Sequence, residues 1–274
     1  MLGKQPFEDV YERLLVQPSA AYRALTGEPV HLDATAFAEL ITRLKNFREV
    51  YPNMAFWLVI DYKTLTITHS EGDQDVFGFK LATLKDFFRQ IHPDYVLPYL
   101  HWRAAAYSLI HSQYVELDPL EAVYRQTIPL KARDNQFYWF SMNSSVVQVD
   151  AQRRIATNLQ TFYREGKWST RNLRPFEAGV QIKNFSDALE HQLIAQLSLQ
   201  LIEAFTNAEL DLLSLYASGK TAEEIMQTKA WSRNTLHEYN ANLLKKAKAL
   251  FVYDFRNARD FAGYCLEKGF IHIR

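Results

Sequence analysis

The spacing of apolar residues divides the chain into helical and strand-like segments. Apolar positions recur every three or four residues up to about residue 50 and again after Asn184, which predicts amphipathic helices. Between these regions, short apolar runs and alternating polar and apolar residues predict five strands. The strands are expected at 56–62, 64–70, 122–132, 136–150 and 154–164. A helical stretch at 83–111 separates the second strand from the third, and Pro93 and Pro98 are expected to break it.

This order of elements predicts an α+β fold in which a five-stranded antiparallel sheet has its helices grouped on one side. Four regions are expected along the chain. They are an N-terminal helical segment at 1–50, the sheet domain at 51–165, a linker and connector helix at 166–204, and an all-α domain at 205–274.

The connector is expected because 165–184 is polar and contains scattered Gly and Pro, whereas apolar residues then recur at every fourth position. That stripe consists of Phe185, Leu189, Leu193, Leu197 and Leu201. It is compatible with packing inside the chain and equally with a dimer-forming helix.

Three boundary signals in the last 70 residues predict a compact bundle of four short helices. Thr206 and Thr221 are each followed three residues later by a glutamate, which is the spacing of a capping box. Ser232 is a third good N-cap residue, and Gly219 stands where a helix end favours a left-handed residue. The helices are therefore expected at 207–218, 222–229, 233–251 and about 257–267.

The third of these helices has two chemically different sides. Its apolar side, expected to face the bundle, consists of Leu236, Tyr239, Leu243, Ala247 and Leu250. Its other side carries Arg233, Asn234, His237, Ala241, Lys245 and Lys248, with Lys246 beside it. An α-helix fits the major groove of B-DNA, and cationic side chains neutralise phosphates. The residues alone leave two interpretations open, which are DNA contact and a solvated helix face.

These motifs resemble the C-terminal helix-turn-helix of LuxR-type transcription regulators. The matching positions are Thr206, Glu209, Leu213, Leu215, Ala217, Gly219, Thr221, Glu224, Ile225, Ser232, Thr235, Leu236, Asn242, Leu243 and Lys246, and the ending 263–271 also matches. The chain departs from the family pattern at Ala208, Ala222, Glu223 and Tyr239, and it has extra residues between Lys246 and the last helix.

The LuxR-type resemblance implies a set of DNA-binding residues. The set consists of Arg233, Asn234, Thr235, His237, Glu238, Ala241, Lys245 and Lys246. By the resemblance, His237, Glu238 and Ala241 occupy the places that meet base edges, and the others lie near the DNA backbone. Trp231 is expected in the core, where the family has an apolar residue.

The block from about 56 to 165 resembles a PAS sensor domain. The matching features are VFGF at 76–79, His92-Pro93-Asp94 before the long helix, and Arg133-Asp134 followed by Tyr138-Trp139 at the start of a late strand. The resemblance implies a small pocket between sheet and helices, which allows a small-molecule ligand, and it implies dimerisation. The fold does not specify the ligand, so the cofactor is left unknown.

Composition restricts the partners and the compartment. The 274 residues carry a formal net charge of zero, so a nucleic-acid partner must be served by a local basic patch. Cys265 is the one cysteine, which excludes an internal disulfide and suits a reducing cytoplasm. No apolar run approaches the roughly 18 residues of a membrane span, and the N-terminal stretch lacks the apolar core of a secretion signal.

Catalytic and metal-binding motifs are not recognisable. No nucleophile–base pair or nucleotide-binding glycine loop has a motif spacing, so no enzyme is expected. The histidines of the first domain are expected to be structural or surface residues rather than metal or haem ligands; they are His69, His92, His101 and His111. We therefore expect no metal site, and a coloured cofactor with redox chemistry is the least favoured alternative.

The sequence as a whole predicts a cytoplasmic, homodimeric transcription regulator that binds double-stranded DNA and contacts no membrane. The main alternative is a protein-interaction module whose degenerate helix-turn-helix no longer binds DNA. Glu223 and Glu238 motivate this alternative, because both place negative charge near the expected DNA-facing side.

Overall fold

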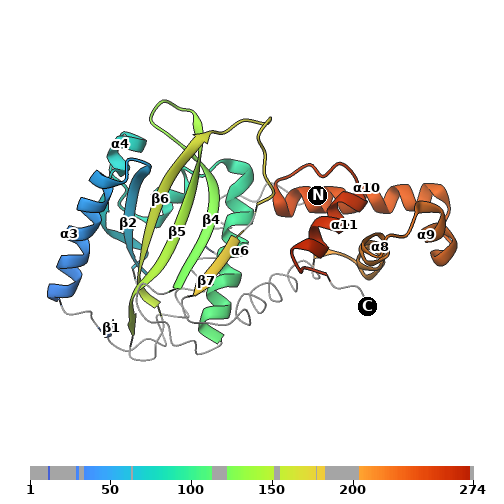
Figure 1. Ribbon diagram of the computed structural model, residues 1–274, viewed down its shortest axis with the longest axis horizontal. Helices are drawn as coiled ribbons and strands as arrows, with labels where there is room; N and C mark the ends of the chain where they lie inside the picture. The colour runs from blue at the N-terminus through green and yellow to red at the C-terminus, as the bar shows by residue number, and fades with distance from the viewer. Residues whose placement is uncertain are drawn as a thin grey trace. The chain divides into compact units, whose positions relative to one another are not determined.

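The computed structural model describes residues 12, 29–30, 34–62, 64–112, 122–150, 155–176, 178–182 and 204–271. The chain forms two compact units. One comprises Met1–Asn172 and Glu177–Phe185, and the other comprises Leu173–Phe176 and Ser186–Arg274. The first contains an antiparallel sheet with helices, and the second is helical (Figure 1).

The sheet of the first unit has the strand order β3-β2-β6-β5-β4-β7, and β1 pairs with β5. The strands are β1 (Pro29–Val30), β2 (Met54–Asp61), β3 (Thr66–Glu71), β4 (Ala122–Lys131), β5 (Phe137–Asp150), β6 (Ile155–Lys167) and β7 (Ala178–Ile182). All pairs are antiparallel. The five strands expected from alternation are therefore confirmed as β2 to β6, and their ends lie close to the expected ones.

The sheet is larger than predicted because the segment interpreted as a linker contributes to it. β6 continues to Lys167, and Ala178–Ile182 forms β7 along the edge of β4. A strand of five residues that includes Gly179 carries a weak sequence signal, because it is short and glycine is depleted in strands. The predicted connector helix at 185–203, and most of the predicted N-terminal helical segment before residue 34, fall outside the described residues.

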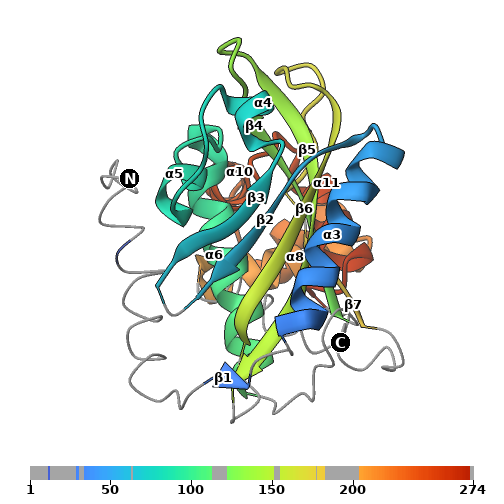
Figure 2. The same cartoon turned by 90° about the vertical axis from the view of Figure 1, so that its left-hand side faces the viewer.

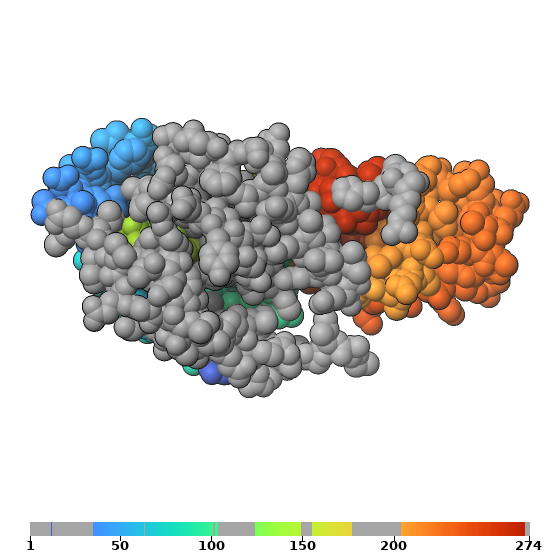
Figure 3. Space-filling model, turned by 90° about the horizontal axis from the view of Figure 1, so that it is seen from below, coloured from blue at the N-terminus to red at the C-terminus, as the bar shows by residue number. Residues whose placement is uncertain are grey.

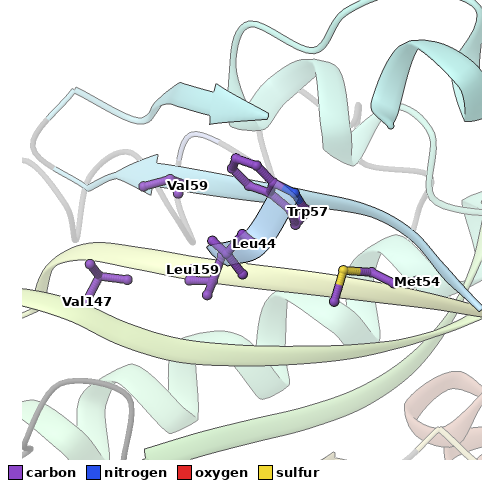
Figure 4. Close-up of a cluster of buried hydrophobic side chains, with 6 residues drawn as sticks. All are labelled: Leu44, Met54, Trp57, Val59, Val147 and Leu159. Atoms are coloured by element: carbon purple, nitrogen blue, oxygen red, sulfur yellow. The ribbon is translucent and has the colours of Figure 1, made fainter. Parts of the chain in front are cut away.

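Helices cover both faces of the sheet rather than one face as predicted (Figure 2). α3 (Ala34–Val50) packs on one face, where its Leu44 joins a buried apolar cluster with residues of β2, β5 and β6 (Figure 4). The other members of this cluster are Met54, Trp57, Val59, Val147 and Leu159. The apolar spacing along 37–44 therefore correctly predicted a helix. It did not indicate which face of the sheet this helix would cover.

The opposite, inner face of the sheet is covered by α4 (Asp73–Phe77), α5 (Leu84–Phe88) and α6 (Pro93–Ser112). Pro93 opens α6, as expected of a residue that lacks an amide hydrogen. Pro98 was expected to break the helix but lies inside it. Only one helical hydrogen bond is lost there, and complete burial of Tyr95 and Tyr99, both 0% exposed, offsets that loss.

The described residues of the second unit form four helices close to the predicted ranges. They are α8 (Asn207–Ala217), α9 (Ala222–Lys229), α10 (Arg233–Phe251) and α11 (Ala258–Glu267). Leu212, Ile225, Leu243 and Phe261 are fully buried and form its core. In the described portion of the chain, no helix has both the length and the apolar character required to cross a lipid bilayer.

Candidate nucleic-acid interface

α9 and α10 begin with side-chain caps and are joined by a short turn. The Thr221 hydroxyl accepts from the Glu224 amide at 3.3 Å, and the Glu224 carboxylate accepts from the Thr221 amide at 2.7 Å, which is a reciprocal capping box. The Ser232 hydroxyl accepts from the Thr235 amide at 3.1 Å. Only residues 230–232 separate the two helices, and Ala230 reverses the chain in the left-handed region with φ 53°. A connection of three residues has the length found between the two helices of helix-turn-helix motifs.

One side of α10 is held in the core, which determines the side that faces outward. Leu236, Leu243, Ala247 and Phe251 are between 0% and 5% exposed. Leu236, Leu243 and Ala247 were predicted on this side, whereas Phe251 was not, and the predicted Tyr239 and Leu250 are only partly buried. The side expected to be solvated does face solvent.

Trp231 lies at the turn rather than inside the bundle, where it was expected. Its ring stacks on Tyr239 at 4.3 Å between centroids with an interplanar angle of 6°. Both residues are only partly buried. The stacked pair therefore braces the turn against the second helical turn of α10, a role that spacing alone did not indicate.

The outward side of α10 carries most of the residues implied by the LuxR-type resemblance. The exposed members are Arg233, Asn234, His237, Glu238, Ala241 and Lys245, whereas Thr235 and Lys246 are half-buried. At about 100° per residue, the exposed members fall within an arc of about 140° on one side of the helix. Arg233 and Lys245 lie about 18 Å apart along its axis, at a rise of about 1.5 Å per residue.

Lys246 is directed to the bundle and not to that exposed arc. Its ammonium lies 2.6 Å from Oε2 of Glu209, a residue only 3% exposed at the start of α8. The same carboxylate accepts from the amide and the hydroxyl of Thr206 at 2.7 and 3.0 Å. Burial tends to raise the pKa of Glu209, but the hydrogen bonds from Lys246 and Thr206 outweigh burial and lower it. The structure therefore separates Lys246 from the other implied DNA-binding residues.

The remaining charges of this surface are closely balanced. Lys248 pairs with Asp254 at 2.7 Å, and Lys229 pairs with Asp211 at 2.6 Å. Within the described residues, Arg233 and Lys245 are the cations of α10 without an ion-pair partner. The exposed side of α10 therefore offers two separate unpaired cations rather than a broad basic patch.

Further contacts link α8 to α10 and to α11. The Tyr216 hydroxyl donates to Oδ1 of Asn240 at 3.1 Å. Arg259 of α11 donates to the Lys220 carbonyl at 2.7 Å, and its guanidinium lies 5.9 Å from the centroid of the Tyr216 ring. These partners were missed from the sequence because they are 24 and 39 residues apart in the chain and follow no local spacing rule.

The described residues hold no cluster of three His, Cys, Asp or Glu side chains that could bind a metal ion. Cys265 is 1% exposed, and burial raises the pKa of its thiol. The ring of His92 contacts the rings of Phe137 and Trp168, and burial lowers the pKa of His92. The side chains of His101 and His111 lie outside those that the structure describes.

The described residues define an α+β protein with an antiparallel-sheet unit and a C-terminal unit of helices, in which α10 follows a short turn. Figure 3 shows residues of this helical unit, in orange and red, at the molecular surface. No family model matches the sequence, and no curated protein matches it.

Several solved structures are weakly similar to the chain. Phage VqmA in complex with DPO is 14% identical, and the alignment covers 85% of this chain and 89% of that chain with a TM-score of 0.32. The VqmA–ligand–DNA complex from Vibrio cholera is 15% identical, with 88% and 90% covered and a TM-score of 0.27. The N-terminal domain of a diguanylate cyclase with a PAS/PAC sensor from Marinobacter aquaeolei is 12% identical, with 40% and 93% covered and a TM-score of 0.30. Similarity at this level does not establish a function.

Proposed function

We propose that the chain is a DNA-binding transcription regulator in which a PAS-like sensor unit is joined to a helix-turn-helix unit of LuxR type. One observation carries the proposal. α10 follows a three-residue turn and presents Arg233, Asn234 and His237 in its exposed first turns, with the exposed Lys245 farther along. The first turns of a recognition helix approach base edges, and flanking cations neutralise phosphates.

The size of the side chains on the exposed arc supports close approach to a groove. Ala241 lies near the middle of the arc, with His237 and Lys245 one turn away on either side. A helix with its side chains is about 10–12 Å wide, and the major groove is about 12 Å wide. A methyl group at the centre of the arc therefore lets the backbone of α10 lie deep in the groove while longer side chains reach bases and phosphates.

We propose a homodimer in the cytoplasm as the functional form, with PAS-like dimerisation. The end of α3 exposes apolar area, since Phe47 and Tyr51 are each 48% exposed and Val50 is 70% exposed. Exposed apolar patches mark surfaces that associate. Two recognition helices related by a two-fold axis would contact half-sites about 34 Å apart on DNA.

A second candidate function is a protein-interaction module that keeps the bundle without binding DNA. The observation that favours it is the charge balance of the α9–α10 surface. Lys246 and Lys248 are paired within the protein, and Glu223 and Glu238 are exposed on the side that would meet phosphate. Acidic side chains there reduce non-specific attraction to DNA.

Fluorescence anisotropy with duplex DNA separates the two functions. The full chain is titrated with genomic fragments that it has selected and with random duplex, each at several salt concentrations between about 50 and 200 mM. A regulator is expected to prefer the selected fragments and to lose affinity steeply as salt rises. Equal binding to all sequences, or the absence of binding at the lowest salt, would exclude a sequence-specific regulator and favour the interaction module.

A further inference from the structure

The turn that follows β6 lies in a basic part of the chain. Residues 164–174 include four basic residues and a single acidic one, in a chain whose formal net charge is zero. The basic residues are Arg164, Lys167, Arg171 and Arg174, and all four are exposed. The segment is therefore a local basic feature separate from the candidate interface on α10.

Hydrogen bonds and a ring contact hold this turn on the sheet unit. Oδ1 of Asn172 accepts from the Ser169 amide at 2.8 Å, and Nδ2 of Asn172 donates to the Lys167 carbonyl at 2.9 Å. The centroid of the Trp168 ring lies 4.2 Å from that of the His92 ring. Because these contacts already order the backbone, less conformational entropy is lost when the turn binds a partner.

Two cations of the turn, Lys167 and Arg171, remain available to a partner. Within the described residues, neither has an ion-pair partner. Arg164 lies over a tyrosine ring at 3.6 Å from its centroid, and Arg174 interacts elsewhere in the chain. The acidic residue of the segment, Glu165, accepts from a hydroxyl of β5 at 2.7 Å. An anionic surface is the partner that two exposed cations fit.

The length of the intervening chain limits how far this turn can lie from α10. Five residues after Arg171, the amide of Phe176 donates at 2.7 Å to the carbonyl of Phe251, the last residue of α10. An extended chain covers at most about 3.6 Å per residue, so the Cα atoms of Arg171 and Phe176 are within about 18 Å for any arrangement of the two units. Base pairs follow one another at about 3.4 Å, so this distance corresponds to about five base pairs. A duplex bound by α10 is therefore the anionic partner within reach of the turn.

We propose that Lys167 and Arg171 contact phosphates of duplex DNA beside the site that α10 reads. The proposal rests on the DNA-binding role in the proposed function and extends the contact surface to the sheet unit. Cations that neutralise phosphates release counterions and add affinity without reading bases. The turn should therefore strengthen binding to every sequence equally. It would also offset the repulsion between phosphate and the exposed Glu223 and Glu238.

Fluorescence anisotropy with the full chain measures the contribution of the turn. The double variant Lys167→Ala/Arg171→Ala is titrated with selected fragments and with random duplex at salt concentrations from about 50 to 200 mM. Each lost phosphate contact should lower the slope of log affinity against log salt by about 0.9, so a decrease of about 2 is expected for both kinds of DNA. Between these salt concentrations, the affinity of the variant should fall about tenfold less than that of the wild type.

Lys45→Ala/Lys80→Ala is the matched control. It also removes two exposed cations from the sheet unit, one on α3 and one after α4, and it should keep the wild-type slope. The charge-conserving variant Lys167→Arg/Arg171→Lys should keep that slope as well. If the double alanine variant melts below the wild type, the single alanine variants replace it, each with an expected decrease of about 0.9.

A wild-type slope in the alanine variants, or an equal decrease in the matched control, overturns the proposal. The first result would leave the turn to solvent or to an acidic protein. The DNA-binding proposal still stands in that case, provided that the wild type prefers its selected fragments. Absence of DNA binding by the wild type overturns both proposals.

Discussion

The ammonium of Lys246 lies 2.6 Å from Oε2 of Glu209 and joins α10 to the first turn of α8. Lys245, its neighbour in the chain, is exposed. Two adjacent lysines of the same helix therefore have different environments. One stabilises the bundle, whereas the other is available to a partner.

Lys245→Ala should weaken DNA binding without destabilising the protein. Removal of one phosphate contact is expected to lower the affinity for every sequence and to reduce the slope of log affinity against log salt by about 1. The measurement is anisotropy at several salt concentrations, together with thermal melting. An unchanged salt slope would contradict the placement of α10 on DNA.

Lys246→Ala should have the opposite pattern. It is expected to lower the stability of the protein without removing a contact to DNA. It leaves the nearly buried Glu209 carboxylate without its cation, which is expected to cost about 1–3 kcal/mol. Lys246→Arg, which can still donate to the carboxylate, should recover part of this loss. Denaturant unfolding of the three proteins checks the prediction, and a wild-type midpoint for Lys246→Ala would refute it.

Lowering the pH should remove the stability that the ionised Glu209 contributes. Burial raises the pKa of this carboxyl, but hydrogen bonds from Lys246 and Thr206 hold it below its ordinary value of 4.5. Because the folded-state pKa is the lower one, the contribution is present above the unfolded-state pKa and is lost as pH falls through the folded-state pKa. Glu209→Gln cannot ionise, so between about pH 5 and pH 3 it should lose less stability than the wild type. Melting curves at stepped pH measure the difference, and parallel curves would argue against it.

Tyr216→Phe should weaken the attachment of α10 to α8 and lower the stability of the protein. The variant deletes the hydroxyl that donates to Asn240 at 3.1 Å and is expected to cost about 0.5–1.5 kcal/mol. The matched control is Tyr239→Phe, since the Tyr239 hydroxyl makes no hydrogen bond to any described residue while its ring stacks on Trp231. Equal stability losses in the two variants would show that the Tyr216–Asn240 bond is not the cause.

Glycine should stabilise the turn between α9 and α10 and destabilise the helix that follows. Ala230 has φ 53°, where a side chain is strained, so Ala230→Gly is expected to add up to about 1 kcal/mol. The same change at the exposed Ala249 inside α10 should remove about 1 kcal/mol. Unfolding midpoints that move in the same direction would contradict the left-handed conformation of residue 230.

His237→Ala tests the face that would read bases. His237 is exposed in the second turn of α10, where a side chain of a recognition helix meets base edges. The variant is expected to select a different set of genomic fragments while binding random duplex as the wild type does. Identical selected sequences for both proteins would remove His237 from the contact surface.

Local signals predicted the elements well, because caps and alternation act over a few residues. Thr206, Thr221 and Ser232 cap the helices that they were expected to cap. The alternation at 122–150 likewise marks β4 and β5. By contrast, β7 and the covering of the outer face by α3 depend on pairing and packing between distant segments, which no local pattern specifies.

The candidate interface was predicted only in part for the same reason. Spacing along α10 shows which side faces the bundle, and the exposed residues follow from it. It does not show that Lys246 reaches back 37 residues to Glu209. Lys246 and Glu209 each match the family pattern and were therefore interpreted separately, whereas in the structure they form an ion pair.

Phe176 has a consequence for attempts to study the helical unit alone. The short stretch Leu173–Phe176 belongs to this unit, where Phe176 is 1% exposed and its amide donates to the Phe251 carbonyl at 2.7 Å. Its sequence neighbours on both sides belong to the sheet unit. A fragment that begins at residue 205 would thus omit a ring from its own interior and be weakened by the cut itself. Chimeras that exchange the sheet unit for a foreign domain need to carry this tetrapeptide with the helical unit.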